Sequence, residues 1–173
     1  FRVNGSYENK ESFRDIVQTE KHYFKPSFLY NISDKTQIII EADYLKHHFT
    51  PDFGLGGLVL NTTTSESKLN TLLGINKFLG ATWQYQTNEM LTSTITLNHE
   101  INSNWNFNTV AFFQDYTRDF YGTERIQWNL QTNGDYVWKR TLNKQLQEQK
   151  YGSLQFNLNG QFKTGKLNHK LLV

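Results

Sequence analysis

The stretch from Tyr151 to Val173, YGSLQFNLNGQFKTGKLNHKLLV, decides the fold. Apolar residues and glycines occupy every second position in its first half: Gly152, Leu154, Phe156, Leu158, Gly160 and Phe162. The residues between them are polar. Since side chains of a β-strand alternate with period two, this pattern predicts a strand with one apolar and one polar face. Thr164-Gly165 predicts a tight turn, and a second strand begins at Lys166. The apolar face of this hairpin has to meet either a protein core or lipid.

The composition of the 173 residues excludes several classes of protein. The chain holds no run of about 18 apolar residues, which excludes transmembrane helices. A membrane barrel stays possible, because lipid-facing and lumen-facing residues alternate along its strands. The net charge of +2 is too small to indicate a nucleic-acid partner. The chain has no cysteine, which excludes a disulfide scaffold and thiol chemistry.

The alternation recurs along the chain and predicts an all-β antiparallel meander. We expect about seven spanning strands, at residues 1–8, 20–32, 36–45, 90–101, 105–116, 151–163 and from 166 onward. Short turns at 33–35, 102–104 and 164–165 alternate with long connections at 9–19, 49–88 and 118–149. In the last connection, residues 124–141 resemble a hairpin around Asn133-Gly134. Short turns on one rim and long loops on the other are typical of an outer-membrane barrel.

A soluble sandwich or lipocalin-like barrel would alternate in the same way. Two features favour the membrane. The apolar faces carry no Lys or Arg in mid-strand, where each would cost about 2–4 kcal/mol against lipid. Lys46 and Asp115 break this rule, but both lie near the far rim. The opposite faces are rich in Asn, Gln, Thr and Ser, as a wet lumen would be. Pro26 lies within a predicted strand, and we expect a bulge there because proline donates no ladder hydrogen bond.

Four segments resemble the barrel of a TonB-dependent outer-membrane siderophore receptor, of the ferrichrome and ferripyoverdine type. They are SFRDIV (12–17) followed by Lys25-Pro26-Ser27, ISDKTQIIIEADYL (32–45), FLGATW (78–83) and FKTGKLNHKLL (162–172). Such receptors have a roughly 22-stranded transmembrane β-barrel with a plug in its lumen. The resemblance implies that residues 1–173 are part of one barrel domain. The chain opens and stops in strand-like sequence, so we expect a piece of a longer protein without its plug and C-terminal strands.

The resemblance also implies a function and a location. It implies uptake of ferric siderophores across the bacterial outer membrane, without enzymatic activity and without a cofactor other than the transported ferric siderophore. The implied partners are the siderophore, the membrane lipid and the TonB complex, which would be contacted through regions absent from this chain. No nucleic acid is expected. The alternative function is a soluble or surface β-sheet binding module, such as an adhesin or a glycan-binding protein.

Aromatic and cationic residues of the long-loop rim are the candidate ligand contacts. Aromatic rings and cations suit an anionic or catechol-bearing iron chelate through stacking and charge. The candidates are Phe53, Trp83, Tyr85, Tyr116, Arg118, Tyr121, Arg125, Trp128 and Trp138. His47 and His48 do not predict a metal site, because adjacent residues of a strand point to opposite faces. No catalytic signature is present.

Overall fold

The computed structural model of the chain describes residues 1–61, 63–64 and 66–173. Within these residues the protein is all-β. None of the described residues belongs to a helix that could span a membrane. The strands are β1 (Arg2–Glu11), β2 (Gln18–Ser33), β3 (Thr36–Phe49), β4 (Gly57–Asn61), β5 (Glu66–Leu69), β6 (Tyr85–Asn102), β7 (Trp105–Thr123), β8 (Gln127–Leu130), β9 (Tyr136–Lys139), β10 (Leu142–Thr164) and β11 (Leu167–Leu172).

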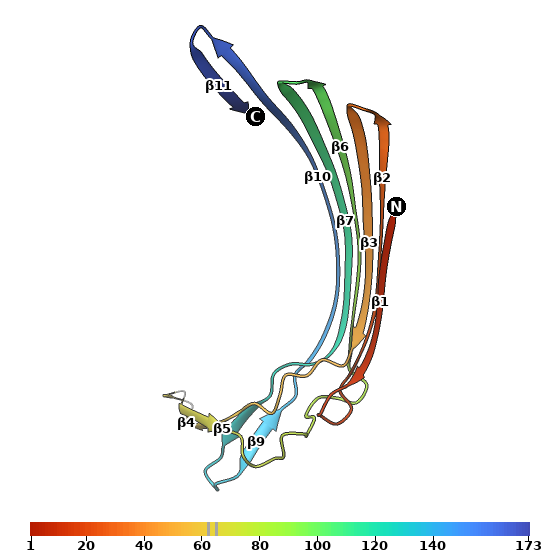
Figure 1. The fold of residues 1–173 in the computed structure, drawn as a ribbon. Helices are drawn as coiled ribbons and strands as arrows, with labels where there is room; N and C mark the ends of the chain where they lie inside the picture. The colour runs from red at the N-terminus through yellow and green to blue at the C-terminus, as the bar shows by residue number, and fades with distance from the viewer. Residues whose placement is uncertain (62, 65) are drawn as a thin grey trace.

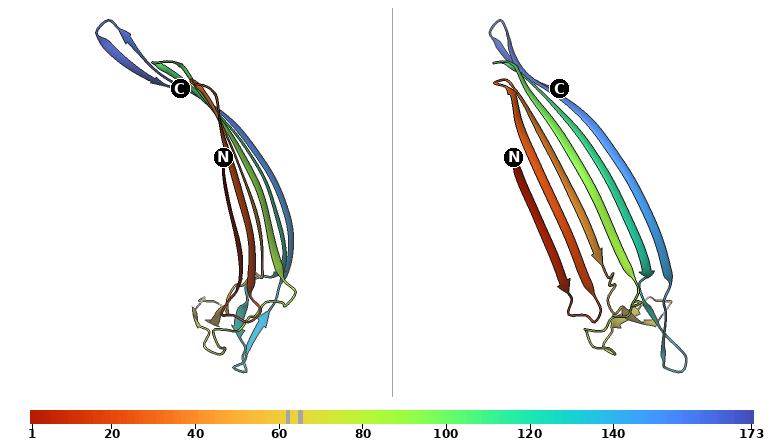
Figure 2. Two further views of the ribbon diagram at one scale, coloured as in Figure 1. Left: turned by 45° about the vertical axis from the view of Figure 1, so that its right-hand side comes forward. Right: turned by 90° about the vertical axis from the view of Figure 1, so that its right-hand side faces the viewer.

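The long strands form one antiparallel sheet in the order β1-β2-β3-β6-β7-β10-β11. The sheet bows strongly along its length (Figure 1), and its strands run side by side from β1 to β10 (Figure 2, right). β1 and β11 are the two edge strands, so the sheet is an open wall. This arrangement confirms the predicted antiparallel meander.

Short turns and long connections separate to opposite ends of the wall, as the sequence predicts. The turns after β2, β6 and β10 lie at one end, and in the last of them Gly165 has a φ of +61°. The described residues of 12–17, 50–84 and 124–141 lie at the other end. A positive φ favours glycine because it has no Cβ, which explains how the Thr164-Gly165 sequence makes so tight a turn.

The apolar face of the wall has the height of a membrane. On β3 this face runs from Thr36 to Lys46, and it carries Ile38, Ile40, Ala42 and Tyr44 between them. The β6 residues opposite these four are Leu97, Ile95, Ser93 and Leu91. The ten residue steps from Thr36 to Lys46 span about 33 Å at about 3.3 Å per residue. A strand tilt of about 40° projects this length to about 25 Å, which is the height of the apolar band of outer-membrane barrels.

Charged side chains on the apolar face pair with one another at the edge of this band. Lys46 Nζ lies 2.7 Å from Glu89 Oε1, in the residue pair where β3 faces β6. Lys150 Nζ lies 3.3 Å from Asp115 Oδ2, where β10 faces β7. The two exceptions noted in the sequence, Lys46 and Asp115, therefore mark the upper limit of the membrane-facing surface. Both pairs are partly exposed, so each contributes little to stability.

Several predicted boundaries were wrong. The long connections are shorter than expected because β1, β2, β3, β6, β7 and β10 all extend further toward this rim. Residues 57–61 and 66–69, expected to lack regular structure, are strands β4 and β5. The bulge expected at Pro26 is also absent, since the register of β2 against β3 is the same on both sides of this residue. The shift lies instead between Asn31 and Ser33, next to the turn.

The two longest connections build a second, four-stranded sheet in the order β5-β4-β8-β9. The predicted hairpin is present as β8 and β9, with Gly134 at a φ of +89° in its turn. β4 pairs with β8 in parallel, so the sheet joins two loops that are far apart in the sequence. Leu58, Ile126 and Trp128 form its buried core. We call the described residues of 50–84 and 124–141 together the loop module.

Candidate ligand-binding face

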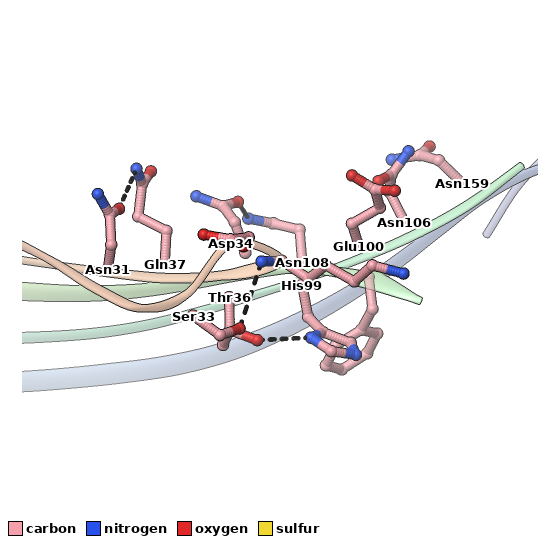
Figure 3. A pocket seen from close by; sticks show the side chains of 13 residues that line it. Asn31, Ser33, Asp34, Thr36, Gln37, His99, Glu100, Asn106, Asn108 and Asn159 are labelled. Carbon is pink, nitrogen blue, oxygen red and sulfur yellow. Dashed lines mark hydrogen bonds between the residues drawn. The ribbon is translucent and has the colours of Figure 1, made fainter. Parts of the chain in front are cut away.

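The polar face of the wall carries a row of amide side chains that crosses five strands. Each member lies opposite the next in the ladder, one residue from each of β2, β3, β6, β7 and β10: Asn31, Gln37, Asn98, Asn108 and Asn157. Side-chain hydrogen bonds of 2.8–3.1 Å link three of the four neighbouring pairs. Figure 3 shows Asn31, Gln37 and Asn106 on one side of the sheet, and Ser33 and Thr36 on the other. A hydrogen-bonded amide lining is what a water-filled lumen favours.

Arg118 lies on this same face, beyond the apolar band and next to the loop module. It is three residues after Asp115, so it points to the face opposite that of the Asp115 carboxylate. Its guanidinium donates hydrogen bonds of 3.3 Å to Gln86 on β6 and to Gln145 on β10. It also lies over the ring of Phe120, at 5.5 Å from the centroid. Tyr116 is beside it, and its hydroxyl donates a 3.3 Å hydrogen bond to Asn88.

The charge of Arg118 has no acidic partner among the residues that the structure describes. Both bonded side chains are neutral amides, and the Nε atom is buried without a hydrogen-bond partner. A buried donor that lacks a partner is costly, so its position calls for an explanation. The planar fork of an arginine matches carboxylate, phosphate and catecholate oxygens. Arg118 and Tyr116 are therefore suited to hold an anionic ligand on the lumen face.

A network of buried polar groups holds the loop module to the wall. Gln84 is only 4% exposed. Its side-chain oxygen accepts hydrogen bonds from the Ala81 amide at 2.9 Å and the Thr123 hydroxyl at 3.0 Å, and its side-chain nitrogen donates to the Pro51 carbonyl. One side chain thus joins both ends of the connection between β3 and β6 to the end of β7.

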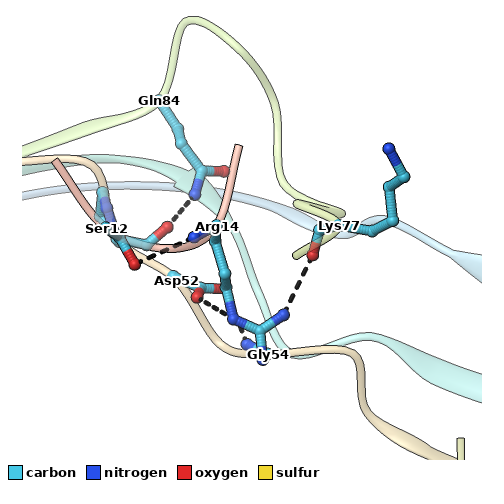
Figure 4. Close-up of polar contacts among 7 residues, drawn as sticks. Ser12, Arg14, Asp52, Gly54, Lys77 and Gln84 are labelled. Atoms are coloured by element: carbon cyan, nitrogen blue, oxygen red, sulfur yellow. Dashed lines mark hydrogen bonds and ion pairs between the residues drawn. The ribbon is translucent and has the colours of Figure 1, made fainter. Parts of the chain in front are cut away.

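A second clamp joins the connection between β1 and β2 to the loop module (Figure 4). Arg14 Nε lies 2.9 Å from Asp52 Oδ2, and Arg14 Nη1 donates a 3.0 Å hydrogen bond to the carbonyl of Lys77. Lys77 in turn pairs with Asp15 at 3.2 Å. Arg14 and Asp52 are about four-fifths buried, so their pair is screened less by salt than a surface pair. All three long connections therefore form one packed layer at this rim.

The structure separates the sequence-predicted ligand contacts into three groups. Tyr116 and Arg118 lie on the lumen face. Trp128 and Trp138 pack together in the loop module, with ring centroids 5.5 Å apart, and Trp128 is 7% exposed. Trp83, Tyr85 and Tyr121 form a cluster on the outward face, the face that carries the apolar band. Phe53 and Arg125 are exposed and join none of these groups.

The outward cluster, Trp83 with Tyr85 and Tyr121, is held by β6 and β7. Tyr85 lies opposite Tyr121 in the ladder, and the rings of Trp83 and Tyr121 are 4.5 Å apart. The Tyr85 hydroxyl donates a 3.0 Å hydrogen bond to Asp119, which raises the pKa of this tyrosine. These side chains face away from the lumen, so they do not contact a ligand held by Arg118.

The sequence reasoning missed the glutamines that position these groups. Gln84 holds the loop module to the wall, and Gln86 and Gln145 accept the hydrogen bonds of Arg118. None of the three stands out in a sequence with 18 Asn and 18 Thr. The spacing along the strand was an available signal. The position numbers of Tyr116 and Arg118 are even and that of Tyr121 is odd, so the first two point to the opposite face of the strand from Tyr121. His47 and His48 also lie on opposite faces. Among the described residues, no group of His, Cys, Asp or Glu side chains could hold a metal ion.

The wall has the fold of an outer-membrane receptor barrel. It carries an apolar band on one face and a polar surface on the other, with short turns at one rim and a folded loop module at the opposite rim. No protein-family model matches the chain. The chain is 23% identical over 170 residues to the catecholate siderophore receptor Fiu of Escherichia coli O6:H1, with 91% of this chain and 22% of the relative aligned. It is 24% identical over 174 residues to the metal-pseudopaline receptor CntO of Pseudomonas aeruginosa, with 100% of this chain and 23% of the relative aligned.

A solved structure gives the same result. The crystal structure of the ferric-catecholate import receptor Fiu from E. coli K12, in its closed form, matches with a TM-score of 0.79 and 23% identity, over 98% of this chain and 26% of that one. The chain thus has the fold of a segment of a TonB-dependent siderophore receptor barrel. This confirms both the predicted fold class and the resemblance found in the sequence. The chain spans less than a quarter of the length of its curated relatives.

Proposed function

We propose that the chain is part of an outer-membrane receptor that binds ferric siderophores and takes them up with energy from the TonB complex. The relatives are named as receptors for a catecholate siderophore and for metal-pseudopaline. Both cargoes are metal chelates, which supports a chelate as the ligand of this chain. The bacterial outer membrane is the location that the height of the apolar band supports. TonB would be contacted by parts of the receptor outside this chain.

The observation that carries the proposal is the position of Arg118. It lies on the lumen face, above the apolar band and next to the loop module, and within the described part of the chain only neutral side chains accept its hydrogen bonds. A negatively charged chelate in the lumen would be attracted to this cation. Charge-assisted hydrogen bonds of this kind are about twice as strong as neutral ones. The iron arrives within its chelate, so the proposal needs no resident cofactor.

Uptake by the full-length receptor tests this proposal. The gene is deleted in its own host, and uptake of radiolabelled iron is measured with a ferric catecholate siderophore and, separately, with a metal-pseudopaline complex. We expect the deletion to abolish uptake of at least one complex, and the intact gene to restore it. Equal uptake of both by the deletion strain, or recovery of the receptor in the soluble periplasm, would refute the proposal. Loss of surface attachment without any loss of uptake would instead favour an adhesin or glycan-binding protein.

A further inference from the structure

A pocket lies on the lumen face beside the connection between β1 and β2. Its volume is about 320 Å³, within the range of about 300–1,000 Å³ that small-molecule sites occupy. His47 and Phe49 of β3 form one wall, with ring centroids 4.5 Å apart and planes 24° apart. Lys10 of β1 and Thr19 of β2, which lie opposite each other in the ladder, also line it. We call this cavity the His47 pocket.

The His47 pocket and Arg118 lie at the same height on the lumen face. The β6 residue opposite His47 is Asn88, and the β7 residue opposite Asn88 is Arg118. Two strand spacings therefore separate His47 from Arg118, which is about 10 Å. One chelate with two anionic arms can reach both groups.

The charges around His47 balance while its ring is neutral. Lys21 lies opposite His47 on β2, and Glu8 of β1 pairs with Lys21 at 3.8 Å and with Lys10 at 3.2 Å. Glu11, at the end of β1, also lines the pocket. Two lysines thus stand against two carboxylates.

The other titratable groups near His47 belong to the opposite face of the sheet. The β6 residue that faces His47, Asn88, is a neutral amide. The neighbours at outward positions of β2, β3 and β6 are Glu20, His22, Lys46, His48 and Glu89. The protonation of His47 therefore decides whether this part of the lumen face carries a net positive charge.

His47 is able to take up a proton when an anion binds. Its Nε2 shares a 2.8 Å hydrogen bond with the Thr19 hydroxyl, which donates to the neutral ring and accepts from the protonated one. In the described part of the chain this is the one side-chain hydrogen bond of the ring, so Nδ1 is left for a ligand. Partial burial, followed by the charge of Lys21, lowers the pKa of His47, so the ring is neutral at neutral pH. An anion beside the ring favours the charged form and raises this pKa.

We propose that the His47 pocket is a second anion-binding point of the lumen face, which holds an aromatic, anionic arm of the ferric chelate when His47 is protonated. The proposal rests on the proposed function and extends the site from Arg118 on β7 to β3. A catecholate ring would stack on the wall of His47 and Phe49, while an oxygen of the same arm accepts hydrogen bonds from His47 Nδ1 and Lys10.

This arrangement couples chelate binding to pH. Binding takes up a proton, so the chelate binds more tightly as the pH falls. The gain is complete below the pKa that His47 has without ligand, and it is lost as the pH rises through the higher pKa of the complex. An anion that raises the pKa of His47 by about one strengthens its own binding about tenfold.

Titration of full-length receptor variants tests the proposal. The receptor is purified in detergent and titrated with a ferric catecholate siderophore and, separately, with iron-free dihydroxybenzoate, at about pH 7.5 and about pH 5.5, which bracket the titration of histidine. Variants are compared at the same pH, so the titration of the ligand itself cancels. We expect the fall in pH to strengthen binding by the wild type about tenfold more than binding by His47→Gln. His47→Arg carries a permanent charge and should exceed His47→Gln about tenfold at both pH values.

His48→Gln is the matched control, because it removes a histidine from the next position of β3, on the outward face. It should keep the pH response of the wild type. Heat-modifiable gel mobility shows whether each variant keeps its barrel. The same pH response in the wild type and in a folded His47→Gln would overturn the proposal, and so would loss of the response in His48→Gln. If His47→Gln does not fold, His47→Arg decides: an affinity equal to that of the wild type at the higher pH would overturn the proposal.

The two ligands separate this proposal from the proposed function. A receptor that binds no ferric siderophore, but binds iron-free dihydroxybenzoate with the pH response that depends on His47, refutes the proposed function and keeps the pocket as an anion site. A receptor that binds the ferric siderophore without this response refutes only the role of the His47 pocket. Binding of neither ligand refutes both.

Discussion

The indole nitrogen of Trp128 donates a 2.8 Å hydrogen bond to the carbonyl of Leu55, which lies 73 residues earlier in the chain. Strands β6 and β7 separate the two residues in sequence. The parallel pairing of Leu58 with Trp128 reinforces the contact. Two connections that belong to different hairpins of the barrel wall therefore share one core and one sheet.

Removal of this contact should loosen both loops together. Trp128→Phe keeps most of the ring but removes the indole donor, while the Leu55 carbonyl keeps its 3.2 Å hydrogen bond from the Asn70 side chain, so the expected cost is about 0.5–1.5 kcal/mol. Trp128→Ala also empties the core and should cost about 3–5 kcal/mol. Hydrogen exchange of the Leu58–Asn61 amides measures the effect. These amides lie in a different loop from the mutation, so unchanged protection in Trp128→Ala would show that the loops fold separately. Trp138→Phe is a control that keeps the Leu55 bond.

Gln84 should be sensitive to a change that preserves its size. Gln84→Leu leaves the Ala81 amide, the Thr123 hydroxyl and the Pro51 carbonyl without their partner, and each unsatisfied buried group costs about 1–3 kcal/mol. We expect the loop module to detach while the wall stays folded. Limited proteolysis of the receptor in detergent should then cut within residues 50–84 much faster than in the wild type. The same substitution at the exposed Gln127 should have little effect, and equal cleavage of the two variants would contradict the role of Gln84.

Arg118 should contribute to ligand affinity through charge and geometry. Arg118→Gln removes a charge-assisted contact worth about 1.5–3 kcal/mol, which corresponds to about a 10- to 150-fold weaker binding of an anionic ferric chelate. Arg118→Lys restores the charge without the planar fork, so its affinity should be intermediate. Equilibrium titration with a ferric catecholate siderophore measures both. Lys163→Gln removes a cation at the opposite end of the wall and should leave affinity unchanged. Wild-type affinity in Arg118→Gln would exclude Arg118 from the site.

Gly160 should not tolerate a side chain, because a Cβ at this position would overlap the ring of Trp105 on the neighbouring strand. Trp105 stacks on Phe162 at this edge of the band, at 6.3 Å between centroids and with planes 9° apart. Gly160→Ala should therefore destabilise the barrel by about 1–3 kcal/mol through overpacking.

Gly152→Ala is the matched control on the same strand and face. Its added Cβ would meet only the backbone oxygen of Phe112, at 3.8 Å. Urea unfolding of the full receptor, followed by gel mobility and tryptophan fluorescence, compares the two variants. If Gly152→Ala lowered the free energy of unfolding as much as Gly160→Ala, loss of glycine rather than contact with Trp105 would be the cause.

The alternation of apolar and polar side chains predicted the strand segments that cross the membrane. It did not predict the parts of the same strands that extend above the membrane. Between Thr36 and Lys46 one face meets lipid and the other meets water, so apolar and polar residues alternate. Beyond Asp115 the outward face of β7 leaves the lipid, and Phe120 and Thr123 are buried at 3% and 2% exposure, so residues 117–123 lose the contrast that marks a strand in the membrane. The same holds for residues 142–149 of β10, which the sequence indicated as loop. The alternation of apolar and polar residues therefore reflects lipid on one face and water on the other, rather than the backbone hydrogen bonds between strands.

The loop module could not be predicted for a different reason. β4 and β5 are only five and four residues long, and β4 finds a parallel partner in another loop. Nothing in the local sequence of residues 57–61 specifies a partner about 70 residues away. The hairpin around Asn133-Gly134 was predictable because its turn and both strands are adjacent in sequence. The site residues show the same contrast between local and long-range information. Arg118 was recognised by its residue type alone, whereas its glutamine partners are determined by the register between neighbouring strands.

The shared core of the loop module has a consequence for engineering and evolution. A loop transplanted alone from another receptor would bring half of a core: residues 50–84 would lose Trp128, or residues 124–141 would lose Leu58. The unit that can be exchanged between such receptors is therefore the pair of loops, and a change of ligand preference should spread through recombination of both segments at once. Chimeras designed one loop at a time would then fail because they misfold, and their failure would carry no information about specificity.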